Sequence, residues 1–385
     1  MRTRSAVSTT VTLLVIVVII LAAVAGYGFV YSGHTVTTTV GGAGTTVTST
    51  VNGGGSTVTA AQQTLAQEAQ AEGGSVTVYG VIDASAWSSV IQPAFQQQYP
   101  WAHVTYDSLS GAQVGTKALS DFKAGSVTAD VLISGLTQLE ATIQGGAVQQ
   151  WNDSAFLYSM GYTSSNVDPQ GYWSPGYVLP GIIIYNKDLV SPSQVPTSYT
   201  DLANPIWKGK VVIQDPSSLG GVGATFSTLY PIMGNASFTT FMHNLAANNP
   251  VIVSSNGVSL TDVQSGQYPV GMGQLNDYIA AQKAGNSTLG AVFAAPVVGL
   301  PNVVCITKNA PHPYMAELLT QWLASIPGQQ ALAQTGRTPQ NSLLAAQALA
   351  GYVPSNVSIV VEDYNNPSFY TDTGFWSGYF HNIFG

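Results

Sequence analysis

Charged residues are scarce in this chain of 385 residues, since only 7 % of it is Asp, Glu, Lys or Arg, against roughly 25 % in an average soluble protein. With 10 basic and 18 acidic residues, the chain has no electrostatic footprint for nucleic acid. Its surface must therefore consist mainly of uncharged polar residues and glycine. We interpret the scarcity of charge as favouring acidic or saline surroundings, where carboxylates are protonated or charges are screened.

The chain has a single cysteine, Cys305, in the apolar run "NVVCIT". It can therefore form neither an internal disulfide nor a cysteine metal cluster. Catalytic motifs are also missing, because the sequence contains no Gly-x-Ser-x-Gly, no His-Glu-x-x-His and no clustered carboxylate pair. None of the five histidines has the spacing of a metal ligand. The sequence thus predicts neither an enzyme nor a protein with a resident cofactor.

A long apolar run stands near the N-terminus. The segment from Val11 to Val30 has no charged residue and follows Arg2 and Arg4. About 20 such residues span a bilayer, and basic residues on the N-terminal side keep that end cytoplasmic. We predict that residues 1–31 are an uncleaved membrane anchor, with the rest of the chain on the extracellular face of the cell membrane. A signal peptide cleaved near "AVA" is the alternative.

Residues 32–74 are predicted to be a stalk. The tract "HTVTTTVGGAGTTVTSTVNGGGSTVT" consists mostly of Thr, Val and Gly, so that it cannot bury a core. "AAQQTLAQEAQAEGG" then predicts a short helix that ends at two glycines. Four Asn-x-Ser/Thr triplets suit an external glycoprotein, and they begin at Asn152, Asn235, Asn286 and Asn356.

From residue 75 onward, strand patterns alternate with helix patterns. "SVTVYG", "HVTYDS" and "ADVLIS" are strand-like, and a helical apolar pattern follows each of them. A second block of the same kind begins after "PGIIIYNK" and includes "KVVIQ", "PVIVS" and "YPVGMG". This order predicts an α/β protein with a mostly parallel sheet covered by helices on both faces.

Several segments carry a resemblance to a known family. "VTVYGVIDASAW", "ADVLISGLTQLEATIQGGAVQQW" and above all "YNKDLVSPSQVPTSYTDLANPIWKGKV" are similar to the extracellular solute-binding proteins of ABC importers. These proteins have the type II periplasmic-binding-protein fold, and the chain resembles the branch that includes ferric-ion-binding proteins. The resemblance covers roughly residues 75 to 340.

The resemblance implies two α/β lobes, joined by two crossing strands, that close on a ligand between them. It assigns residues 75–177 and 303–385 to lobe 1 and residues 178–302 to lobe 2. The implied function is to capture a small solute (an oxyanion, a phosphonate or carboxylate, or a metal chelate) and to deliver it to an ABC permease in the membrane. A surface structural or adhesive glycoprotein that reuses this fold is the alternative.

Candidate binding residues follow from the rule that ligands lie beyond the carboxyl ends of the strands in an open α/β sheet. Helix N-termini there favour anions and polar oxygens. In "QDPSSLGGVGATF" the small residues precede a helix, but the Gly-Lys-Ser/Thr of a P-loop is missing. The resulting candidates, together with three aromatic or amide side chains, are Asp83, Ser85, Ser110, Gly111, Ser134, Gly135, Tyr177, Ser217, Ser218, Gly220, Asn276 and Tyr278.

The segment "QLNDYIAA" departs from the ferric branch, which the resemblance implies would carry two adjacent tyrosines here. Tyr278 matches the first tyrosine, and Ile279 replaces the second. Asp83 stands where that branch has an iron-binding histidine, and Gly135 stands where it has a glutamate. Tyr278 would be an iron ligand if the solute were ferric. Otherwise Tyr278 and Asn276 are predicted to bind an organic ligand, with Tyr278 as a core residue the alternative.

The C-terminal segment "YNNPSFYTDTGFWSGYFHNIFG" is rich in aromatic residues. Burial against lobe 1 is one interpretation, and docking to a permease or to an envelope layer is the other.

Overall fold

The computed structural model describes residues 34–39, 46–51, 60–151, 153–361 and 373–385. The chain divides into two compact units, Met1–Gln63 and Thr64–Gly385. In the first unit β1 (His34–Thr39) and β2 (Thr46–Val51) form an antiparallel pair, where the sequence analysis expects an extended stalk. Alternating Thr and Val explain this pair, since β-branched residues favour strands. The predicted anchor and Asn152 lie outside the described residues.

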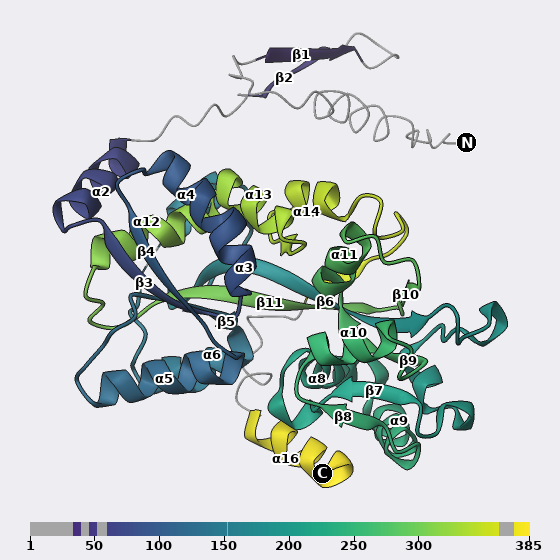
Figure 1. The fold of residues 1–385 in the computed structure, drawn as a ribbon. Helices are drawn as coiled ribbons and strands as arrows, with labels where there is room; N and C mark the ends of the chain where they lie inside the picture. Colours follow the sequence, from purple (N-terminus) through teal and green to yellow (C-terminus); the bar gives the residue numbers. More distant parts are fainter. Residues whose placement is uncertain (1–33, 40–45, 52–59, 152, 362–372) are drawn as a thin grey trace, which may run out of the picture. The chain divides into compact units, whose positions relative to one another are not determined.

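The second unit contains one continuous sheet with the strand order β4-β3-β5-β11-β6-β9-β7-β8 (Figure 1). In its first half, β3 (Ser75–Gly80) pairs in parallel with β4 (His103–Ser108) and with β5 (Val131–Gly135). The helices of this half are α2 (Ala60–Ala71), α3 (Ala84–Ala86), η1 (Trp87–Ile91), α4 (Gln92–Gln98), α5 (Gly111–Lys123), α6 (Leu136–Gln144), α7 (Ser154–Ser159), α12 (Pro313–Ala324) and α13 (Ile326–Gln334).

Two long antiparallel strands, β6 (Ser174–Asn186) and β11 (Val297–Ile306), join the halves of the sheet. The first part of β6 pairs with β11 and with β12 (Thr338–Pro339). Its second part pairs with β9 (Val270–Gln274) and β10 (Leu289–Val292). These are the crossing strands that the resemblance implies, and they connect two lobes.

In the second half, β7 (Val211–Gln214) lies parallel to β8 (Val251–Val253) and to β9. The helices and turns of this lobe are η2 (Pro192–Gln194), η3 (Tyr199–Ala203), η4 (Pro205–Trp207), η5 (Pro216–Ser218), α8 (Gly221–Met233), α9 (Asn235–Ala247), α10 (Asn256–Gln264) and α11 (Leu275–Lys283). Among the described residues, no helix has both the length and the apolar character that a membrane crossing requires.

Apolar residues pack on both faces of the sheet in each lobe. In β5, Val131 and Ile133 belong to one buried cluster and Leu132 to another. In β6, Ile183 and its neighbour Ile184 are divided between two further clusters in the same way. Successive side chains of a strand point to opposite faces, so this division shows that helices cover both faces, as the α/β pattern predicts.

The C-terminal part of the chain returns to the second lobe. After α14 (Ser342–Leu349), strand β13 (Ile359–Val361) pairs with the start of β11. Helix α16 (Thr373–Phe384, yellow in Figure 1) then packs beside α8 and α9, and it buries Trp376 and Phe380. This differs from the expectation that the tail packs against lobe 1. The reason is that α8 and α9 present aromatic side chains, which α16 covers.

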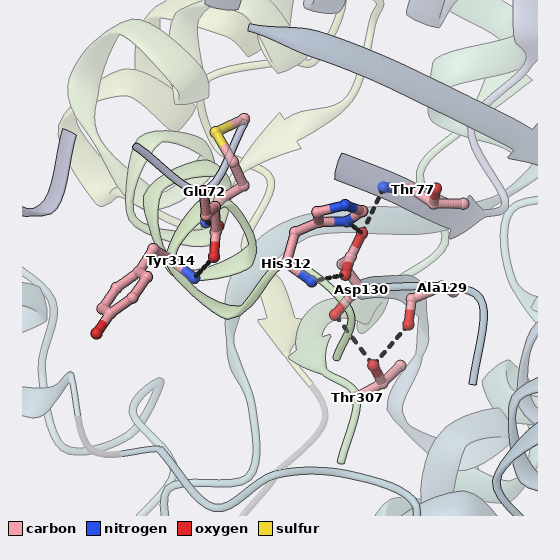
Figure 2. A network of polar contacts seen from close by, with 8 residues as sticks. Glu72, Thr77, Ala129, Asp130, Thr307, His312 and Tyr314 are labelled. Atoms are coloured by element: carbon pink, nitrogen blue, oxygen red, sulfur yellow. Dashed lines mark hydrogen bonds and ion pairs between the residues drawn. The ribbon is translucent and has the colours of Figure 1, made fainter. Parts of the chain in front are cut away.

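The buried carboxylate of Asp130 connects several elements at one edge of the first lobe. This edge lies opposite the strand ends that carry the candidate loops. Asp130, which is fully buried, accepts hydrogen bonds from the backbone N–H of Thr77 at 2.7 Å and of His312 at 2.7 Å (Figure 2). The His312 Nδ1 atom lies 3.1 Å from the same carboxylate. Thr307 Oγ1 donates to the Ala129 carbonyl at 2.6 Å. Asp130 therefore links the loop before α12 to strands β3 and β5.

We expect Asp130→Asn to lower the free energy of unfolding by about 2 kcal/mol, because an amide NH₂ would face an N–H donor and leave it unsatisfied. Urea unfolding at pH 7 measures this loss. Asp107→Asn is the matched control, since Asp107 is exposed on β4 and its change should stay within about 0.5 kcal/mol. An equal, small loss in both variants would contradict the role of Asp130.

Candidate ligand-binding site

A cavity of about 350 Å³ lies at the carboxyl ends of the parallel strands of both lobes. Residues that follow β3, β4 and β5 line one wall, and residues that follow β7, β8 and β9 line the other. The crossing strands form its floor through Tyr177, Leu179, Leu300, Pro301 and Asn302. This volume lies within the range of roughly 300–1,000 Å³ found for small-molecule sites.

Five helices begin at the cavity. The lining includes the first residues, or the residue just before them, of α5, α6, α8, α10 and α11. Three of these helices, which begin after Gly135, Gly220 and Gln274, have no side-chain cap. Because the first N–H groups of a helix lack partners within the helix and carry partial positive charge, these ends favour an anion or polar oxygens.

Among the described residues, Arg337 is the only basic side chain that lines the cavity, and it follows α13. Its guanidinium donates from Nη2 to Asp83 Oδ2 at 3.2 Å and from Nη1 to Thr335 Oγ1 at 3.1 Å. It also lies over the Tyr177 ring, 5.3 Å from the ring centroid. Burial opposes the charged form of Arg337, but Tyr177 and Asp83 outweigh it and raise the pKa of the guanidinium. The cavity therefore contains a permanent, oriented cation.

Buried polar atoms without partners border the same cavity. The Oδ1 atoms of Asn256 and Asn276 are buried and have no hydrogen-bond partner in the structure. The Asn256 amide nitrogen, in contrast, donates to Gln214 Oε1 at 3.0 Å. Since buried polar groups normally have hydrogen bonds, this concentration indicates a surface built to contact a polar solute.

A second carboxylate sits beside the cation. Burial raises the pKa of Asp277 to about 6, with an increase from the charge of Asp83 and an opposing effect of Arg337. Asn276 Nδ2 donates to Asp277 Oδ1 at 2.7 Å. With Asp277 ionised, the charges of Asp83, Asp277 and Arg337 sum to one negative charge. With Asp277 protonated, the charges of Asp83 and Arg337 cancel, so acid pH favours an anionic ligand.

The structure brings part of the predicted site together. The predicted residues that line the cavity are Asp83, Ser110, Gly111, Gly135, Tyr177, Gly220 and Asn276. Their binding of a ligand stays a prediction. Tyr177 is fully buried, so that it contributes to the floor between the lobes.

Five predicted residues do not line the cavity. Ser134 is fully buried and donates to Gln138 Oε1 at 3.1 Å, so its hydroxyl orients a lining residue instead. Tyr278 packs on the apolar cluster beneath α10 and α11. The others are Ser85 in α3 and Ser217 and Ser218 in η5, which lie close in sequence to lining residues.

Sequence reasoning missed Arg337, Asn256 and Asp277, together with the carboxamides Gln138, Gln214 and Gln274. The strand-end rule applied to "PVIVS" would have named Asn256, because α10 follows β8 directly. No short-range signal pointed to Arg337. Among the described residues, no group of three or more His, Cys, Asp or Glu side chains is placed to hold a metal ion.

Two α/β lobes, two crossing strands and a polar cavity at the facing strand ends define a solute-binding protein. Residues 91–353 match the bacterial extracellular solute-binding proteins. The chain belongs to this family, whose members serve ABC importers and have the type II fold.

Solved structures show the same fold. AfuA from Actinobacillus pleuropneumoniae, with exogenous fructose 6-phosphate bound, has a TM-score of 0.68 and 18 % identity, over 80 % of this chain and 98 % of that one. Iron-bound HitA from Pseudomonas aeruginosa has a TM-score of 0.65 and 16 % identity, over 80 % of this chain and 99 % of that one.

Among sequence relatives, an uncharacterized protein of Haemophilus influenzae is 26 % identical over 174 residues, 44 % of this chain and 50 % of that protein. The chain thus spans about half the length of this curated relative.

Proposed function

We propose that the chain captures a small polar organic solute with one anionic group in the cavity between its lobes, and that it delivers this solute to an ABC permease. The observation that carries the proposal is the convergence of five helix N-termini and the Arg337 guanidinium on one cavity. The guanidinium and the helix ends would bind the anionic group. The carboxamides and the orphaned oxygens would bind hydroxyl groups.

Free ferric ion fits the cavity less well. The carboxylates that line it are Asp83 and Asp277, and Arg337 stands beside them as a competing cation. Tyr278, the tyrosine aligned with an iron ligand, lies outside the lining. A hard trivalent ion prefers several anionic oxygen ligands, which this set does not supply. The charge pattern instead suits a phosphate or carboxylate attached to a hydroxylated body.

We also propose that residues 1–31 anchor the protein on the extracellular face of the membrane. The family is extracellular, which supports this placement. We further propose that the asparagines of the Asn-x-Ser/Thr triplets are glycosylated. Asn235 and Asn356 are exposed, and Asn286 is half-buried.

A thermal-shift assay at pH 5 tests the ligand class. The probe panel consists of fructose 6-phosphate, unphosphorylated fructose, inorganic phosphate, citrate and ferric citrate. A ligand that binds only the native state adds about 2.7 kcal/mol of stability at 100 times its Kd, so the melting temperature should rise with concentration. We expect a rise with fructose 6-phosphate, and a smaller one with fructose, inorganic phosphate or citrate.

The comparison within the panel is the control. Fructose lacks the anionic group, and inorganic phosphate lacks the hydroxylated body. A shift with ferric citrate but not with citrate would replace the organic solute by iron. Absence of a shift with every member would reject the proposed ligand class, and mass spectrometry of co-purifying solutes would then identify another.

A further inference from the structure

The C-terminal helix α16 packs on the turn that leads into the cavity. Ser377 Oγ donates a hydrogen bond to the Ser217 carbonyl oxygen at 2.8 Å, and Ser217 belongs to η5. Trp376 lies against Tyr230 of α8, with ring centroids 5.1 Å apart. Phe380 lies against Phe226 of the same helix at 6.2 Å. The helix thus contacts both α8 and the turn before it.

The segment between η5 and α8 has an unfavourable backbone. Leu219 has φ 49° and ψ 26°, the left-handed conformation, which costs a side chain with a Cβ roughly 1–2 kcal/mol. Leu219, Gly220 and Gly221 all line the cavity. Strained backbone of this kind persists only where the surroundings hold it in place. The turn is held from within by Asp215, which accepts from the Ser217 N–H at 2.8 Å.

The cavity side of this segment leaves little room for movement. A Cβ atom on Gly221 would come within 2.2 Å of the Asn256 amide nitrogen and 2.8 Å of the Gln274 amide nitrogen. The backbone of Gly221 is therefore packed directly against two side chains of the cavity wall. A shift of the turn would therefore move the first N–H groups of α8 relative to the Asn256 and Gln274 side chains.

We infer that α16 is a positioning element, which holds the η5–Leu219 turn so that the Gly221 N–H at the start of α8 points at the ligand. Its importance for binding rests on the proposed function of the cavity. Its action on the turn does not, and it can be measured without a ligand. The tail is distinctive in the sequence only for its aromatic composition, and its contacts with η5 give it a role at the site.

Hydrogen exchange of the ligand-free, full-length protein tests this role, with mass spectrometry of peptides that cover residues 215–226. We expect Ser377→Ala to speed exchange in this segment roughly fivefold, the effect of one lost hydrogen bond on local opening. Peptides that cover residues 109–116, at the start of α5 on the other lobe, should keep their rate. Ser377→Thr retains the hydroxyl and should restore slow exchange. His381→Ala, an exposed change on the same helix, is the matched control.

A second variant tests the strain directly. Leu219→Asn places a residue that tolerates left-handed backbone at this position. In the Leu219→Asn protein, Ser377→Ala should speed exchange at residues 215–226 less than twofold, because the less strained turn depends less on α16.

The outcomes separate this inference from the proposed function. Unchanged exchange at residues 215–226, or equal acceleration at residues 109–116, would overturn the positioning role and leave α16 as packing alone. Faster exchange at residues 215–226 alone supports it, even if the wild-type protein binds no member of the probe panel. That last result would reject the proposed ligand class and not the role of α16.

Discussion

Replacing Arg337 by Ala should lower the affinity for the anionic member of the probe panel that binds wild type by roughly a hundredfold or more. Removal of one partner from a buried, hydrogen-bonded charge pair costs about 2–5 kcal/mol of binding. The variant loses the only basic side chain that lines the cavity. It also leaves Asp83 as an uncompensated negative charge that repels an anion. Isothermal titration calorimetry at pH 5 measures the change.

Two further variants show whether the loss reflects the guanidinium itself. Arg337→Lys keeps the charge but not the planar donor fork, so affinity should fall by about tenfold. Ser85→Ala alters a residue outside the cavity lining and should leave affinity unchanged. Because Arg337 also bonds Thr335 and covers the Tyr177 ring, urea unfolding of each variant must accompany the titrations. A folded Arg337→Ala protein with wild-type affinity would remove the basis for an anionic ligand.

The half of the site that the sequence predicted follows from one geometric rule. Parallel strands end at the same edge of a sheet, so the loops after β3, β4, β5 and β7 had to meet if the pattern was α/β. Asp83, Ser110 and Gly220 were found in this way. The rule does not say which side chain of a turn faces inward. Ser217 and Ser218 illustrate this, since only the residues just after them line the cavity.

The positions of Arg337 and α16 could not be predicted from the sequence, because both depend on contacts between distant parts of the chain. Arg337 reaches the cavity because the two-residue strand β12 pairs with Tyr177 and Val178 of β6, and a strand so short has no periodicity to detect. The tail was recognised as aromatic, but its partners Phe226 and Tyr230 belong to α8, which is distant from the tail in the sequence. Periodicity marks a helix face as apolar without saying which segment covers it.

The protein should be more stable at pH 4 than at pH 7, chiefly because of Asp153. Burial raises the pKa of this carboxyl from 3.8 to about 6, although a hydrogen bond donated by Ser174 opposes the increase. The folded protein therefore binds this proton more tightly than the unfolded chain does. The resulting stability is fully present below about pH 4 and is lost as the pH rises through 6. A shift of about two pKa units corresponds to roughly 3 kcal/mol.

Other carboxyl groups also make stability depend on pH, some favouring the folded protein at acid pH and one favouring it at higher pH. The pKa values of Asp277, Glu140 and Glu317 are also raised by burial, so these groups add to the stabilisation at acid pH. Asp201 opposes them. Burial raises the pKa of Asp201, but the hydrogen bonds from Thr197 and Ser198 together outweigh burial and lower the pKa. The stability that Asp201 provides is present above its usual pKa and is lost as the pH falls.

Asp153→Asn isolates the contribution of the buried carboxyl, because the amide has nearly the same shape and does not ionise. At pH 7 the variant should be more stable than wild type by up to about 3 kcal/mol, and near pH 4 the two should converge. Urea unfolding at half-unit steps between pH 4 and pH 7 gives the difference curve, with Asp107→Asn as the exposed control. A difference that does not change with pH would show that Asp153 ionises as readily in the folded protein as in the unfolded chain. A curve that falls toward pH 7 more steeply in wild type than in the variant would instead agree with the scarcity of charge in this sequence, which favours a protein built for acidic surroundings.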